Sequence, residues 1–136
     1  MKKIFFVLIF LSSILKGDVK IGAFFSEEKA GTEDVVEFII KIEGAGENIS
    51  TPYVSSNEDF NILSGPSVST SVQIINFNVK KSTEYRWKVN PKREGILVMP
   101  PIEIKIGKEI YKTKEAKIEV QKGSILGGSR KQFPSF

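Results

Sequence analysis

The sequence contains no histidine and no cysteine among its 136 residues. Histidine is the usual general base near neutral pH, and cysteine supplies thiol nucleophiles and disulfides. Structural and catalytic zinc sites depend on these two residue types. We therefore predict that the protein is not an enzyme and has no catalytic, cofactor-binding or metal-binding residues. The fold must be held by its apolar core, because no disulfide can support it.

Long apolar runs are also scarce, and the clearest one lies at the N-terminus. Lys2 and Lys3 precede twelve uncharged, mostly apolar residues at positions 4–15, which are followed by Lys16-Gly17. This run matches the hydrophobic part of a signal peptide and is shorter than the roughly 20 residues of a membrane span. We predict a signal peptide at residues 1–17, with an uncleaved anchor as the alternative. Export to the periplasm or the membrane periphery follows.

The chain has almost no net charge once residues 1–17 are set aside. The whole chain has a net charge of +4, but residues after position 17 hold 17 positive and 16 negative side chains. No basic stripe with interleaved aromatics is present, so we expect no nucleic-acid binding. Membrane contact of the cleaved protein is expected to be peripheral at most.

What the sequence does contain is alternation with a period of two, which is typical of half-buried strands. It is clearest in residues 36–43 and 81–89, and turn signals lie at residues 90–95 and at Gly107-Lys108. This spacing predicts an all-β domain, an immunoglobulin-like β-sandwich over residues 18–121. Residues 122–136, rich in glycine and serine, are predicted to form a disordered tail. No helical period follows residue 17.

Some strand boundaries follow from the same pattern. Residues 60–63 are expected to form a short strand closed by Ser64-Gly65-Pro66. Residues 68–79 are expected to form either one long strand or a hairpin that turns at Asn76-Phe77-Asn78. Residues 110–120 are expected to form a returning strand. The following side chains are predicted to be buried between the two sheets: Phe38, Ile40, Phe60, Tyr85, Trp87, Val98 and Ile104.

The candidate binding site is the longest stretch without a strand signal, residues 48–59. Loops of this length in small domains are commonly functional. Pro52, Tyr53 and Asn57 offer one aromatic anchor among polar groups, which suits contact with a protein partner. The alternative is an ordinary loop with Tyr53 packed onto the core.

Other candidate sites have simpler explanations. Adjacent Glu58 and Asp59 point to opposite faces of an extended segment, so they do not form a catalytic pair. Tyr85 and Trp87 would form a stacking platform for sugars only if they were exposed. A secreted carbohydrate-binding or adhesive module is therefore the alternative function.

Seven short motifs, taken together, resemble a known family. They are Phe60-Asn61-Ile62-Leu63-Ser64-Gly65-Pro66, the serines Ser69 and Ser71, Ile74-Ile75-Asn76, Tyr85-Arg86-Trp87, Asn90-Pro91-Lys92 with Gly95, Pro100-Pro101-Ile102, and Gly107-Lys108 with Tyr111 and Thr113. Their order and spacing resemble the N-terminal domain of BatD, a Bacteroides aerotolerance (oxygen tolerance) protein, over residues 18–121.

The resemblance implies a protein-binding module of an envelope complex. It also implies that the protein acts together with von Willebrand factor A-type and tetratricopeptide-repeat Bat proteins and with a MoxR-type ATPase. Family members usually continue into further sandwich domains and a transmembrane helix, so we expect a truncated member here. Asn76-Phe77 stands where the family often has Asn-Gly.

Overall fold

The computed structural model describes residues 19–44 and 48–126. The described residues form nine strands: β1 (Lys20–Phe25), β2 (Lys29–Gly31), β3 (Val36–Glu43), β4 (Phe60–Ile75), β5 (Asn78–Pro91), β6 (Gly95–Met99), β7 (Glu103–Ile106), β8 (Glu109–Lys112) and β9 (Ala116–Gln121). No helix in this part of the chain is long and apolar enough to cross a membrane. The predicted signal peptide lies outside the described residues, as does the predicted tail from residue 127 onward.

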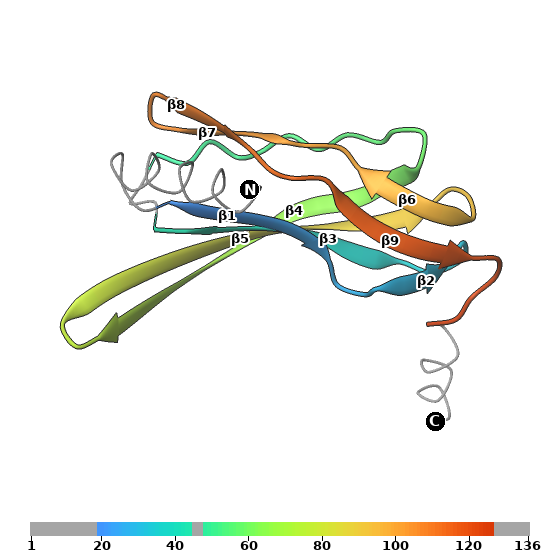
Figure 1. Ribbon diagram of the computed structural model, residues 1–136, viewed down its shortest axis with the longest axis horizontal. Helices are drawn as coiled ribbons and strands as arrows, with labels where there is room; N and C mark the ends of the chain where they lie inside the picture. Colours follow the sequence, from blue (N-terminus) through green and yellow to red (C-terminus); the bar gives the residue numbers. More distant parts are fainter. Residues whose placement is uncertain (1–18, 45–47, 127–136) are drawn as a thin grey trace, which may run out of the picture.

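The strands form two layers (Figure 1). One sheet has the order β1-β3-β5-β4, and the facing layer has β2-β9-β6 with the hairpin β7-β8. The first order corresponds to strands A-B-E-D of an immunoglobulin domain. The turn predicted at residues 90–95 is present, and the chain changes sheets there, between β5 and β6. The predicted fold class, an immunoglobulin-like β-sandwich, is confirmed.

Strand β5 supplies the centre of the core. Its inward side chains Thr83, Tyr85, Trp87 and Val89 are buried, and the outward ones between them are more exposed. The Trp87 ring lies 5.8 Å from that of Phe38, centroid to centroid. Six of the seven side chains predicted to be buried are buried: Phe38, Ile40, Phe60, Tyr85, Trp87 and Ile104.

The seventh prediction, Val98, is wrong. All four residues at positions 96–99 are apolar, so alternation could not indicate which face of β6 points inward. Pairing with β9 decides it, because Leu97 lies opposite the buried Ile118 and Met99 opposite the buried Ala116. Val98 is therefore half-buried on the other face.

The expected end of a strand at Ser64-Gly65-Pro66 is also wrong. The register of β4 against β5 shifts between Ile62 and Ser67, but β4 continues to Ile75. Gly65 has a φ of 121°, and a Cβ there would lie 2.8 Å from the Arg86 carbonyl oxygen and 2.9 Å from the Trp87 Cα. The segment is a bulge that lets the backbone approach Trp87 closely, because glycine has no side chain.

Two further strand boundaries complete the second layer. The turn at Gly107-Lys108 joins β7 to β8 as expected. The predicted returning strand is split into β8 and β9, and at the break the Ile102 backbone N–H donates to the Thr113 Oγ1 at 2.9 Å. Residues 48–50 run beside β7, where the Ser50 N–H donates to the Lys105 carbonyl.

The bulge gives a direct test of the fold. Gly65→Ala should lower the free energy of unfolding by roughly 2–3 kcal/mol, because the new methyl group meets backbone and the φ disfavours it. Gly22→Ala is the matched control, since a Cβ there meets nothing within 4 Å. Urea unfolding followed by Trp87 fluorescence measures both. Equal stability of the two variants would refute the close approach.

Candidate functional site

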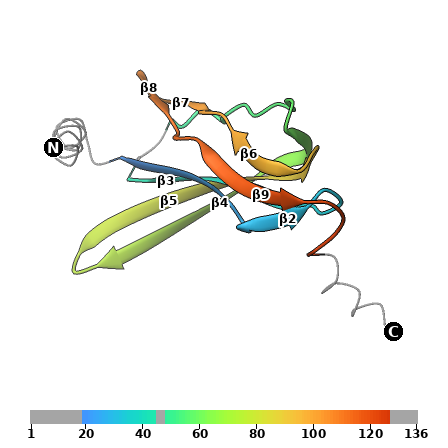
Figure 2. The ribbon, with the colours of Figure 1, turned by 45° about the vertical axis from the view of Figure 1, so that its right-hand side comes forward.

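The β4–β5 hairpin is longer than the sandwich that supports it. Pairing between β3 and β5 ends at Glu43 with Ser82, whereas β4 and β5 remain paired out to Ile75 with Asn78. We call residues 71–82, which run outward from that last pair, the arm. Figures 1 and 2 show the arm projecting away from both layers. Beyond the Glu43–Ser82 pair, no other described strand pairs with the arm.

The inner face of the arm continues the core face of the sheet. Val68 lies opposite the buried Tyr85, and the same face then carries Val72 and Ile74, with Val79 opposite Ile74. Thr70 and Lys81 are the polar members of this face, and Lys81 lies opposite Val72. The four apolar side chains, which we call the stripe, are 54% to 70% exposed because no layer covers them. Along residues 67–75 the opposite face carries serine and glutamine, with Ile75 as its apolar member. The arm is therefore amphipathic.

The tip of the arm is a two-residue turn with an unusual occupant. Asn76 and Phe77 have φ angles of 51° and 68°, as in a type I′ hairpin turn. Such turns favour Asn-Gly, because a bulky side chain disfavours a positive φ. Phe77 is also 98% exposed. Neither its backbone nor its solvent environment favours a phenylalanine there.

Of the three candidate binding residues in the loop predicted from the sequence, Tyr53 alone has a well-exposed side chain. Tyr53 is 81% exposed and borders an open hollow of about 320 Å³ with Glu103, Lys105 and Ile110. Pro52 is buried. Asn57 has its side chain turned inward, where its Oδ1 accepts from the backbone N–H groups of Asp59 at 2.8 Å and Phe60 at 2.9 Å. The three residues therefore do not form one exposed surface.

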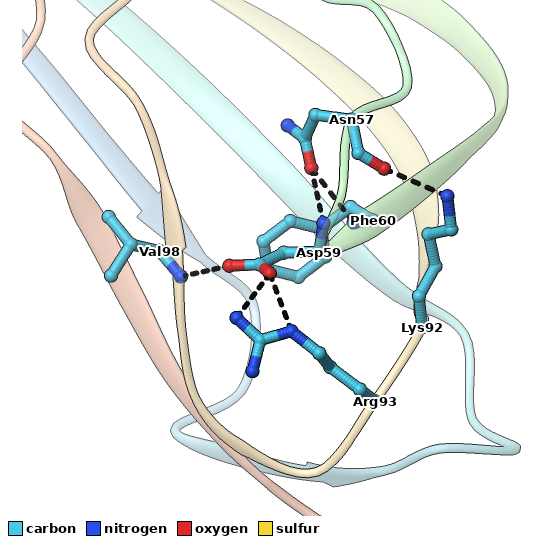
Figure 3. A network of polar contacts seen from close by, with 6 residues as sticks. All are labelled: Asn57, Asp59, Phe60, Lys92, Arg93 and Val98. Carbon is cyan, nitrogen blue, oxygen red and sulfur yellow. Dashed lines mark hydrogen bonds and ion pairs between the residues drawn. The ribbon is translucent and has the colours of Figure 1, made fainter.

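A polar network holds the end of this loop to the turn between the sheets (Figure 3). Arg93 forms an ion pair with Asp59 at 2.7 Å, and the second Asp59 oxygen accepts from the Val98 N–H at 3.2 Å. The Lys92 ammonium donates to the Asn57 carbonyl at 3.0 Å. These contacts give Asn57 and Asp59 a structural role, and they make the loop that carries Tyr53 rigid at this end.

Asp34 is the most enclosed carboxylate of the described residues. Its oxygens accept from the backbone N–H groups of Gly31, Ile125 and Leu126 and from the Ser124 hydroxyl, at 2.7 to 2.9 Å. Burial alone would raise the pKa of Asp34, but these hydrogen bonds outweigh it and lower the pKa from 3.8 to about 2. The contacts also extend the packed domain to Leu126, past the predicted boundary at residue 121.

The stacking platform for sugars has no support in the structure. Tyr85 is 4% exposed and Trp87 2% exposed, and their rings lie inside the sandwich with centroids 6.3 Å apart. Burial also raises the pKa of the Tyr85 hydroxyl. The alternative of a carbohydrate-binding module required these two rings to be exposed, and they are buried.

Sequence reasoning found the Tyr53 loop but missed the stripe. Alternation in residues 68–79 predicted strands there, and a strand's apolar face is ordinarily taken to be covered. The available signals were the length of the segment without charge and the phenylalanine in the turn. These two signals point to an exposed hairpin only if residues 68–79 are taken as a hairpin and not as one long strand.

The two-layer architecture and strand order define an immunoglobulin-like sandwich domain. Residues 23–120 match the protein-family model described as a BatD DUF11 like domain. The chain therefore belongs to the BatD family, as the sequence motifs indicated. No curated protein and no solved structure matches it.

The lowered pKa of Asp34 predicts that the stability of the fold depends on pH. Because its folded pKa lies below its ordinary value, its contribution is complete above pH 3.8 and is lost as the pH falls toward about 2. Asp34→Asn should lower stability at pH 7 by at least about 2 kcal/mol and remove this share of the acid dependence. Chemical unfolding at several pH values measures both effects. Glu33→Gln removes a neighbouring exposed carboxylate as the control, and an equal response of the two variants would contradict the assignment.

Proposed function

We propose that this BatD domain is a non-enzymatic protein-binding module of an exported Bat complex that serves oxygen tolerance or envelope stress. The arm is its docking surface, and the partner covers the stripe. Family membership supports the general assignment. The observation that carries the docking surface is Phe77, an exposed aromatic ring at a turn position that favours glycine.

Two costs at Phe77 support a binding role. A left-handed conformation of a residue other than glycine costs roughly 1–2 kcal/mol. Leaving the ring in water forgoes its burial, which is worth roughly 1.5–3 kcal/mol. A partner that takes up the ring offsets both costs. Strain of this kind is typical of functional positions.

The stripe fits a partner with a flat or shallow apolar surface. Val68, Val72, Ile74 and Val79 follow one face of the hairpin, and Phe77 lies at its end. Aromatic anchors beside a packed apolar centre commonly dominate binding energy at protein interfaces. By family resemblance, the partner is a von Willebrand factor A-type Bat protein, and tetratricopeptide-repeat Bat proteins and a MoxR-type ATPase belong to the same complex.

A role without catalysis is supported by the residue types of the chain. No histidine or cysteine is available as a base, nucleophile or metal ligand. The two carboxylates with the most contacts serve the fold: Asp34 binds backbone N–H groups, and Asp59 pairs with Arg93.

Export is part of the proposal and has its own test. The basic and apolar segment at residues 1–17 supports cleavage, with the exported chain residing in the periplasm or at the membrane periphery. Intact-mass analysis of envelope material should find a chain that begins at or near Asp18. Finding only the full-length chain, in the cytoplasm, would contradict export.

Pull-down with the von Willebrand-type protein tests the docking surface. Phe77→Gly removes the ring and relaxes the turn, so stability should stay unchanged or rise by about 1 kcal/mol. Partner capture should nevertheless fall about tenfold or more, as expected for an aromatic anchor. A merely structural phenylalanine would give the opposite pattern, lower stability with unchanged capture.

Tyr53→Ala belongs in the same assay, because Tyr53 is the exposed aromatic of the rigid loop. Its loss should weaken capture less than the loss of Phe77, since Tyr53 borders an open hollow that Glu103 and Lys105 help to line, whereas Phe77 adjoins the apolar stripe. Loss of capture in Tyr53→Ala with full capture in Phe77→Gly would assign docking to the loop and overturn the arm.

A further inference from the structure

The outer edge of β4 is a long free edge without the usual protection. β4 is the outermost strand of its sheet, and no other described strand pairs with its far side. Natural edge strands are commonly guarded by charges, proline or bulges, which prevent pairing with another chain. Residues 67–75 contain no charged residue and no proline. The bulge of β4 lies before Ser67 and does not interrupt them.

This edge is regular and accessible. From Ser67 opposite Arg86 to Ile75 opposite Asn78, the register with β5 runs without a shift. Figures 1 and 2 agree that the outer part of the hairpin projects from the sandwich, with no other strand beside it. An incoming strand can therefore approach residues 67–75 without displacing any described strand.

The turn determines which backbone groups face outward. Residues that flank a two-residue hairpin turn form a hydrogen-bonded pair, so Ile75 directs its groups toward β5. Hydrogen bonding alternates along an antiparallel strand. Val68, Thr70, Val72 and Ile74 consequently direct their N–H and C=O groups toward the free edge.

We propose that residues 67–75 pair antiparallel with the same segment of a second copy of this chain, about a two-fold axis at Ser71. This self-association goes beyond the binding of a Bat partner. Full overlap of the two segments places Val68 opposite Ile74 and Thr70 opposite Val72. Apolar side chains then meet on the inner face, and serine and glutamine dominate the outer face.

Charge favours a second copy as the occupant. A charged residue on the two-fold axis would face its own copy, which is destabilising, and this segment has no charged residue. Lys80 and Lys81 lie on β5, one strand further in. Three strand spacings then separate β5 from its counterpart, about 14 Å, which exceeds the Debye length in physiological salt.

Symmetry adds a second argument. One two-fold contact closes the β4 edge of both copies at once, so this edge is not left open for further growth. The paired sheets form one continuous eight-stranded sheet, and the two stripes lie side by side on the same face. The dimer therefore presents a wider apolar surface than a single copy does.

Cysteine cross-linking tests the register, because the chain has no cysteine of its own. Ser71→Cys in the purified exported protein should form a disulfide-linked dimer on mild oxidation. Ser71 meets itself at a non-hydrogen-bonded pair, whose close spacing suits a disulfide. Ser82→Cys, directly opposite Ser71 on β5, should remain monomeric, and Ser69→Cys should cross-link far less because it meets Gln73. Equal cross-linking at all three positions would overturn the register.

Sedimentation velocity over a concentration series tests the dimer itself. The protein should dimerise, and Ser71→Lys should raise the dissociation constant about fivefold or more, because two lysines then lie directly opposite. Ser82→Lys is the control for added charge. A monomer at every concentration, or a dimer indifferent to Ser71→Lys, would refute the proposal. Capture of the von Willebrand-type protein by Ser71→Lys is scored separately, so failure of the dimer and failure of partner binding are distinguishable.

Discussion

The structure depends on a mismatch in length between one hairpin and the layer that covers it. β5 directs Val79, Tyr85, Trp87 and Val89 to one face, with Lys81 and Thr83 between the first two, and the second layer buries this face only as far as Thr83. Within the sandwich this face forms the core around Trp87. Beyond it the same face is the stripe, with Val79 and Ile74 in water. The core and the proposed docking surface are therefore two parts of one face of the same sheet.

The arm projects in a fixed direction because its base is firmly held. Gly65 brings the β4 backbone against Trp87, so the hairpin leaves the sandwich at a defined place. At the other end of the domain, Asp59 with Arg93 and Asp34 with residues 124–126 hold the loops. These contacts hold the sandwich together while the apolar face of the arm stays exposed.

Much of the fold could be predicted because its signals are local. Alternation placed Tyr85 and Trp87 in the core, and turn residues located the turn at residues 90–95. Val98 failed because four consecutive apolar residues leave the face of β6 undetermined until β9 pairs with it. The stripe was missed for a related reason. Alternation shows that a strand has an apolar face, whereas the tertiary structure decides whether anything covers that face.

Hydrogen exchange tests the central claim, that the arm is an ordered ribbon whose uncovered face receives a protein. Peptides covering residues 67–82 would be compared by mass spectrometry, at low protein concentration, with and without the von Willebrand-type partner. The account predicts slower exchange in residues 67–82 on binding, because the partner covers the stripe and excludes water. Protection confined to residues 48–59, with the arm unchanged, would contradict it.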